Sequence, residues 1–165
     1  MEKVPAAGYA IKGLWITGVD RNWRSLRNWL FPFKLISSLW NARRILRRFR
    51  PELVVGVGGF ASGPVLHQAA QMGIPTAIQE QNSFPGITNR FLAKRVGLIC
   101  AGFPGLERWF PADRIVETGN PLRMQVLDAV SDHGQSTEAA WKHFEFDGSR
   151  PVVFVMGGSL GAASM

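Results

Sequence analysis

Neutral hydrogen-bonding side chains crowd into one short stretch, residues 79–90, with the sequence QEQNSFPGITNR. The stretch directly follows the apolar run of residues 74–78, which is typical of a buried strand. A surface turn needs only one or two such side chains, and Pro85 with Gly86 is enough to turn the chain. The excess of amides and hydroxyls therefore predicts a site at the strand end that holds a ligand rich in hydroxyl groups.

Two glycine clusters each stand between an apolar run and a helical pattern. The first is GVGGFASGP, residues 56–64, and the second is MGGSLGA, residues 156–162. Glycines at a strand end let the backbone approach a ligand, and the free N–H groups of a following helix favour an anion. The alternative is that the glycines only make tight turns. The first cluster has neither the lysine of a P-loop nor the glycine spacing of a dinucleotide-binding motif.

The other candidate groups are single residues. Arg123, in the motif GNPLR, suits phosphate oxygens, although a surface ion pair is at least as common a role for an isolated arginine. His67, His133 and His143 have no neighbours at metal-ligand spacing, so we expect no metal site. Cys100 is the single cysteine, which excludes an internal disulfide and favours a reducing compartment.

A basic segment lies between residues 21 and 50, where nine cations occur without an acid, although the whole chain has a net charge of only +7. A local patch of this kind points to an anionic partner. Aromatic and aliphatic residues are interleaved with the cations, which favours a membrane surface over a solvated helix face or nucleic acid. The side chains assigned to the membrane surface are Trp29, Phe31, Trp40, Arg43, Arg44, Arg47 and Arg48.

Apolar runs alternate with helical patterns along the chain, which predicts an α/β fold with a parallel sheet covered by helices on both faces. Residues 53–79 are uncharged and long enough to cross a bilayer, but their glycines and prolines divide them into strand, loop, helix and strand. Ser62 is the expected N-cap of that helix. Strands are expected within residues 13–19, 52–59, 74–79, 97–102, 114–120 and 150–156, and helices within residues 33–49, 62–73, 86–96 and 136–146.

Four motifs, in their order and spacing, closely resemble the MurG family of peptidoglycan glycosyltransferases. They are GVGGFASGP, QEQNSFPGITNR, ETGNPLR and GGSLGA. The resemblance implies a GT-B fold, in which two Rossmann-like domains face each other across a cleft. It also implies transfer of N-acetylglucosamine from UDP-GlcNAc to a hydroxyl of the lipid-linked muramyl-pentapeptide, which converts lipid I to lipid II. The family transfers the sugar with inversion in one displacement and requires no metal or other cofactor.

The resemblance also assigns site residues by position. Glu80 is the one acid in the matched stretch, where a structural hydrogen-bonding role competes with that of a general base. No other residue is assigned as the base. The residues matched to UDP-GlcNAc binding are Asn82, Arg123 and Ser159, with Arg123 at the phosphates. The residues matched to the acceptor or the cleft are Gly58, Gly59, Ser62 and Asn89.

The chain departs from the family pattern at two positions: Gln79 stands where many members have histidine, and Leu160 replaces a common glutamine. The family's first glycine loop should precede residue 1, so we expect a fragment. Residues 1–122 would form most of an acceptor domain and residues 123–165 the start of a UDP-sugar domain. The expected location is the cytoplasmic face of the bacterial inner membrane, as a peripheral protein without a nucleic-acid partner. The alternative is a non-enzymatic Rossmann-like module that binds a nucleotide or nucleic acid.

Overall fold

The computed structural model describes residues 3–18, 29–131 and 135–153. The chain divides into two compact units, Met1–Asn120 and Pro121–Met165. The first unit contains all four strands of the described residues, whereas the second contains the helices α6 (Met124–Ser131) and α7 (Gln135–His143). The division expected at residue 122 between an acceptor domain and a UDP-sugar domain stays a prediction.

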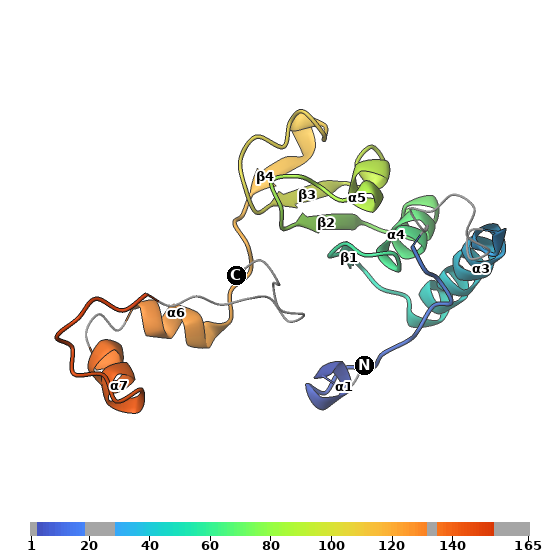
Figure 1. Cartoon of the computed structure of the whole chain (residues 1–165). Coiled ribbons are helices and arrows are strands. Elements are labelled where there is room, and N and C mark those ends of the chain that lie inside the picture. The colour runs from blue at the N-terminus through green and yellow to red at the C-terminus, as the bar shows by residue number, and fades with distance from the viewer. Residues whose placement is uncertain (1–2, 19–28, 132–134, 154–165) are drawn as a thin grey trace. The chain divides into compact units, whose positions relative to one another are not determined.

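The first unit is built on a parallel four-stranded sheet, which confirms the predicted fold class (Figure 1). Its strands pair in chain order, each parallel to the next. All their carboxyl ends therefore meet at one edge, which is where ligands bind in sheets of this kind. The strands are β1 (Val54–Gly56), β2 (Thr76–Glu80), β3 (Leu98–Ala101) and β4 (Ile115–Glu117).

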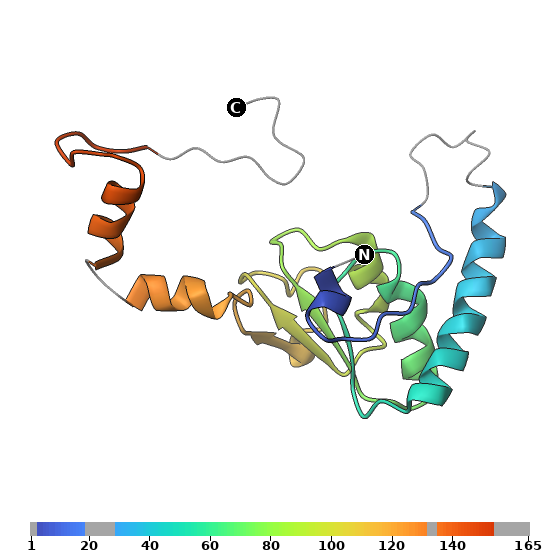
Figure 2. The ribbon, with the colours of Figure 1, turned by 90° about the horizontal axis from the view of Figure 1, so that it is seen from below.

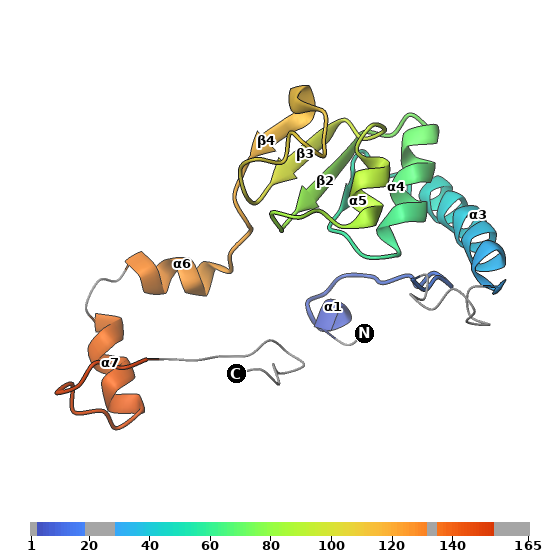
Figure 3. The same ribbon diagram turned by 45° about the horizontal axis from the view of Figure 1, so that its top comes forward.

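Two helices connect the strands and cover one face of the sheet. Helix α4 (Ser62–Gln71) links β1 to β2, and α5 (Ile87–Leu92) links β2 to β3. Figure 3 shows both helices over the same face of the sheet, as right-handed crossovers in one direction require. The core between the helices and the sheet is apolar. Strand β2 lies inside the sheet and is buried along its whole length. Fully buried core side chains include Leu66, Ile78, Leu92, Val96 and Ile99.

The basic segment forms the long helix α3 (Phe31–Phe49), which packs beside α4 (Figure 2). Its buried residues recur every fourth position, at Lys34, Ser38, Ala42 and Leu46. The two polar ones are satisfied by the N-terminal segment: the Lys34 amine donates to Thr17 Oγ1 at 3.2 Å, and the Ser38 hydroxyl donates to the Trp15 carbonyl at 2.9 Å.

Several local expectations are corrected by the structure. The strand expected at residues 13–19 is wrong, since residues 9–18 form no regular element and lie against α3 through the contacts of Trp15 and Thr17. Ser62 does not cap α4: the N-cap is Ala61, and the Ser62 hydroxyl donates instead to the Gly58 carbonyl at 2.5 Å. The sequence patterns do not predict helices α1 (Lys3–Ala6), η1 (Ala112–Arg114) and α6.

The last expected strand lies mostly outside the described residues. Residues 150–153 are described and form no strand, and residues 154–165 fall beyond the described ranges. The helix expected at residues 136–146 is confirmed as α7.

Candidate functional site

A pocket of about 340 Å³ opens at the carboxyl ends of β1 and β2, and we call it the polar pocket after the carboxylate and amide side chains in its wall. One wall is the glycine loop after β1, and the other is the stretch between β2 and the first turn of α5. The two motifs that the sequence singled out, 56–64 and 79–90, therefore face each other across one cavity. The residues that line it are Val57, Gly58, Gly59, Phe60, Glu80, Gln81, Asn82, Gly86, Ile87, Thr88 and Asn89.

Glu80 is the centre of this pocket's hydrogen bonds, although it is only 2% exposed. Its Oε1 accepts from the Asn82 backbone N–H at 3.0 Å and from Asn82 Nδ2 at 3.1 Å. Its Oε2 accepts from the Gly86 N–H at 3.3 Å and from Asn89 Nδ2 at 2.8 Å. Two carboxylate oxygens offer about four lone-pair positions, so these donors occupy all of them. The geometry favours the structural role of Glu80 over that of a general base.

The alternation of β2 explains where its two terminal polar side chains go. Glu80 points to the same face as Ile78, toward α5 and the loop it holds, whereas Gln79 points to the opposite face. Gln79 is 9% exposed, and its Nε2 donates to the Gly119 carbonyl at 3.2 Å. Both residues therefore organise the strand ends from within the protein, although the sequence pattern suggested that Gln79 faced a ligand.

The glycine loop adopts backbone conformations that side chains disfavour. Gly58 and Gly59 have φ values of +88° and +78°, where residues other than glycine are strained. A Cβ on Gly58 would lie 3.9 Å from Asn89 Nδ2, whereas a Cβ on Gly59 would meet nothing within 4 Å. The loop thus approaches Asn89 on one side and leaves open space at Gly59, as a backbone that receives a ligand requires.

The side chain of Asn120, which follows β4, contacts the wall of this pocket and was not predicted from the sequence. Asn120 Nδ2 donates to the Gln81 carbonyl at 3.1 Å. A Cβ on Gly102 would collide with the Asn120 side chain, so a larger residue there would displace the Asn120 amide. Asn120 belongs to the motif GNPLR, of which the arginine was interpreted from the sequence but the asparagine was not. Its amide beside a strand end was the available signal.

The structure brings together five of the predicted site residues, because Gly58, Gly59, Glu80, Asn82 and Asn89 all line the polar pocket. Ser62 lies behind them, as the first residue of α4. Arg123 belongs to the second unit, where it is exposed and directly precedes α6. Ser159 lies outside the described residues, so both of these assignments stay predictions.

The predicted membrane set separates into two groups around α3. Trp29, Trp40, Arg44, Arg47 and Arg48 are exposed. Phe31 and Arg43 are half-buried instead: Phe31 lines an apolar pocket, and Arg43 Nη1 donates to Gln68 Oε1 at 3.3 Å.

The exposed side of α3 carries apolar residues that the sequence did not single out. Phe33 and Ile36 are 67% and 66% exposed, and they stand seven and four positions before Trp40. The Arg44 guanidinium lies 5.8 Å from the Trp40 ring centroid. We call this set, Phe33, Ile36, Trp40, Arg44, Arg47 and Arg48, the outer face of α3.

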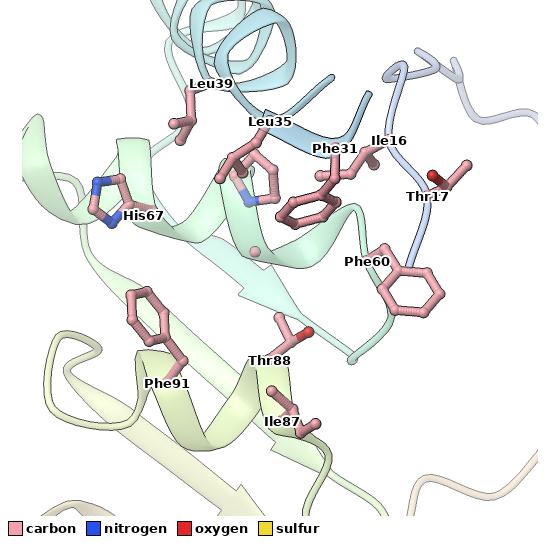
Figure 4. A pocket seen from close by; sticks show the side chains of 12 residues that line it. Ile16, Thr17, Phe31, Leu35, Leu39, Phe60, His67, Ile87, Thr88 and Phe91 are labelled. Carbon is pink, nitrogen blue, oxygen red and sulfur yellow. The ribbon is translucent and has the colours of Figure 1, made fainter. Parts of the chain in front are cut away.

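An apolar pocket of about 350 Å³ adjoins the polar pocket, since Phe60, Ile87 and Thr88 line both. Figure 4 shows Phe31, Leu35 and Leu39 of α3 directed toward it, with His67 of α4 and Phe91 of α5 on the other sides. Burial and then the nearby Arg95 charge lower the pKa of His67 below its usual value. Arg95 Nη1 lies 3.2 Å from His67 Nδ1, which must accept because a guanidinium only donates.

Neither a metal cluster nor a membrane-spanning helix occurs in the described part of the chain. No three or more of its His, Cys, Asp and Glu side chains gather as a metal site. None of its helices combines the length and apolar character needed to span a bilayer. Cys100 is half-buried in β3.

Comparisons with known proteins match the N-terminal part of the chain to a glycosyltransferase domain. Residues 1–99 match the model of the glycosyltransferase family 28 N-terminal domain. A Christiangramia forsetii protein named UDP-N-acetylglucosamine--N-acetylmuramyl-(pentapeptide) pyrophosphoryl-undecaprenol N-acetylglucosamine transferase is 51% identical over 162 residues, which is 98% of this chain and 43% of that protein. A Cytophaga hutchinsonii protein of the same name is 47% identical over 165 residues, which is 100% of this chain and 43% of that protein.

Among solved structures, a crystal structure of Acinetobacter baumannii MurG shares 30% identity with the chain. The match has a TM-score of 0.49 and covers 62% of this chain and 34% of that one. The chain spans less than half the length of the curated relatives it matches.

Proposed function

The chain belongs to the family of the glycosyltransferase family 28 N-terminal domain. From this we propose that the protein transfers N-acetylglucosamine from UDP-GlcNAc to a lipid-linked muramyl-pentapeptide. The names of the relatives support this substrate pair. The structural observation that carries the proposal is the polar pocket, in which the glycine loop and the asparagine-rich stretch meet at the carboxyl ends of β1 and β2. Such a pocket suits a sugar attached to a diphosphate.

The proposed reaction is a single displacement at the anomeric carbon. The acceptor hydroxyl oxygen forms the new bond, the bond to the UDP oxygen breaks, and UDP leaves with the electron pair. The acceptor proton goes to a base that we do not assign, because Glu80, the acid that lines the pocket, already accepts four hydrogen bonds. We assign Asn82, Arg123 and Ser159 to the UDP-sugar, and Gly58, Gly59 and Ser62 to the acceptor side. No metal or other cofactor is required in this scheme.

The outer face of α3 gives the proposed enzyme a way to reach a lipid substrate. Aromatic and aliphatic side chains occupy its first half and arginines its second. This combination favours the interface of an anionic membrane, where rings insert among headgroups and cations pair with phosphates. We therefore assign the protein to the cytoplasmic face of the bacterial inner membrane.

The activity is tested with the purified protein, with UDP-GlcNAc that carries a labelled sugar, and with the lipid-linked acceptor. We expect labelled disaccharide-lipid, and we expect Asn82→Ala to lower kcat/KM by about 10-fold or more, as loss of a substrate hydrogen bond does. Gln71→Ala is the matched control, because it removes an exposed amide from the last turn of α4. Absence of transfer by the unaltered protein would reject the proposal.

Membrane binding is tested by sedimentation with phosphatidylglycerol vesicles. Reversal of Arg44, Arg47 and Arg48 to glutamate should release the protein from the vesicles. The control reverses three exposed lysines outside α3, Lys12, Lys94 and Lys142, with the same change in net charge. Equal release by both triples, or tight binding of duplex DNA by a protein that ignores the vesicles, would remove the membrane assignment.

A further inference from the structure

We propose that the apolar pocket is a subsite for the lipid chain of the acceptor, and that it holds the first isoprene units beyond the diphosphate. This inference rests on the proposed function and deepens it, because the pocket residues assigned so far contact sugars and phosphates and leave the lipid chain itself unassigned. The relatives are named for a pyrophosphoryl-undecaprenol substrate, in which a long isoprenoid chain directly follows a diphosphate.

The walls of this pocket have the chemistry of a lipid site. Figure 4 shows Leu35 and Leu39 of α3 directed toward the cavity, with Phe91 of α5 on another side. None of the described residues that line it is an acid, a lysine or an arginine. Burial and the Arg95 charge lower the pKa of His67, so the ring of this lining residue stays mainly uncharged near neutral pH. Such a wall favours the exchange of water for a hydrocarbon chain.

Three large apolar side chains of this pocket are exposed. Ile87, Phe91 and Phe60 are 83%, 66% and 59% exposed, and all three line the cavity. A single exposed apolar residue is ordinary, but exposed apolar surface that gathers around one cavity marks a binding site. A hydrocarbon chain in the pocket would cover part of each of these side chains.

The apolar pocket continues the polar pocket, because Phe60, Ile87 and Thr88 line both. Phe60 directly follows Gly58 and Gly59, in the loop whose backbone N–H groups suit phosphate oxygens. A ligand with its diphosphate at this loop would therefore extend past Phe60 into the apolar pocket. The acceptor has its groups in this order, diphosphate and then hydrocarbon, whereas UDP-GlcNAc has no hydrocarbon chain. The pocket therefore suits the acceptor and not the donor.

Helix α3 places the pocket beside the surface that we assign to the membrane. Leu35 and Leu39 line the pocket, and their neighbours in the chain, Ile36 and Trp40, belong to the outer face of the same helix. A lipid chain that leaves the bilayer at α3 thus has a short path into the pocket. The volume of about 350 Å³ is near the lower end of the range for ligand sites, roughly 300–1,000 Å³. The pocket therefore holds only the first units, and the rest of a long chain stays in the bilayer.

Binding of short soluble probes tests the subsite without vesicles. Farnesyl diphosphate should bind the unaltered protein about 10-fold or more tightly than inorganic diphosphate, since it adds a short isoprenoid chain to the same polar group. Leu35→Gln and Phe91→Gln each make the wall more polar. Each should weaken the binding of farnesyl diphosphate by about 10-fold and change that of inorganic diphosphate by less than about 2-fold. Isothermal titration calorimetry measures both ligands.

Phe49→Gln is the matched control for Phe91→Gln, because Phe49 is 77% exposed on a helix and lines neither the apolar nor the polar pocket. Equal losses in these two variants would overturn the proposal, as would farnesyl diphosphate that binds the unaltered protein no more tightly than inorganic diphosphate. Phe91 is exposed, so this comparison stands even if Leu35→Gln, at a half-buried position, fails to fold.

A photoreactive group at the end of the farnesyl chain shows where the chain lies. We expect cross-links to residues that line the apolar pocket. Cross-links to the outer face of α3 would mean that the chain stays on the surface of the protein, and would overturn the proposal.

These measurements also separate this inference from the proposed function, because they need no sugar transfer. If the protein binds the farnesyl chain in the apolar pocket but transfers no sugar, the proposed function is wrong and the subsite holds. If the protein transfers the sugar but the farnesyl chain adds nothing to binding, the proposed function holds and the subsite is wrong.

Discussion

The polar pocket and the outer face of α3 hold their functional side chains in opposite ways. In the pocket, one buried carboxylate accepts four hydrogen bonds that fix the backbone and two amides. On α3, the side chains of Phe33, Ile36 and Trp40 extend into solvent at more than 60% exposure, while the other side of the helix packs. We therefore expect the pocket residues to contribute to stability as well as to the proposed binding, and we expect the outer face to tolerate substitution without loss of the fold.

The largest effect is expected from Glu80→Ala. The substitution leaves the donors of Asn82, Gly86 and Asn89 without their acceptor and opens a cavity beside β2. We expect the free energy of unfolding to fall by about 3 kcal/mol. Chemical denaturation followed by circular dichroism would measure it.

Glu117→Ala is the matched control for this prediction, since Glu117 occupies the same row of the sheet on β4 but is exposed. We expect its effect to stay within about 0.5 kcal/mol. Similar unfolding energies for the two variants would show that the Glu80 hydrogen bonds do not hold the loop, and the comparison with α3 would lose its basis.

A glycine pair separates strain from binding. Gly59 and Gly73 have similar positive φ values, +78° and +73°, and a Cβ on either would meet nothing within 4 Å. Alanine at either position should therefore cost about 1 kcal/mol of stability. Only Gly59 lines the pocket, so only Gly59→Ala should also raise the KM of the transfer reaction. Equal kinetics for the two variants would show that the loop does not receive a ligand.

The outer face of α3 should give a smaller stability effect and a clear binding effect. Trp40→Ser removes an exposed ring and its contact with Arg44, so the unfolding energy should change by less than about 0.5 kcal/mol while vesicle binding weakens. Leu46→Ala, on the buried side of the same helix, should instead destabilise the protein and leave vesicle binding of the folded fraction intact. A reversed pattern would mean that α3 faces protein rather than membrane.

The smallest effect is a pH dependence from His67, beside the apolar pocket. Burial and the Arg95 charge lower its pKa in the folded state, so the unfolded chain binds the proton more readily. Its contribution to stability is therefore fully present above the unfolded pKa of about 6.5 and decreases as the pH falls toward the folded value. His67→Gln should flatten the fall in melting temperature between about pH 7 and pH 5. An unchanged slope would contradict the assignment.

The sequence predicted the sheet and the pocket well because both depend on local patterns. The apolar runs at residues 53–56, 74–78 and 97–101 predicted strands, and glycines or amides at their ends marked one edge of a parallel sheet. The segment at residues 13–19 was misread because its described part is held to α3 by hydrogen bonds from Lys34 and Ser38 and not by pairing with a strand. Whether such a short segment pairs as a strand or lies against a helix depends on residues that are far away in the sequence.

By itself, the sequence determined the strand order along the chain, the amide and carboxylate side chains at the end of β2 and the charge of α3, because composition and spacing are local properties. Only the tertiary structure decided the direction of each polar side chain. Glu80 and Gln79 are neighbours of similar length, yet strand alternation sends one to the loop donors and the other to Gly119. A buried charge requires partners from several segments at once, and no single segment of the sequence specifies where those segments meet.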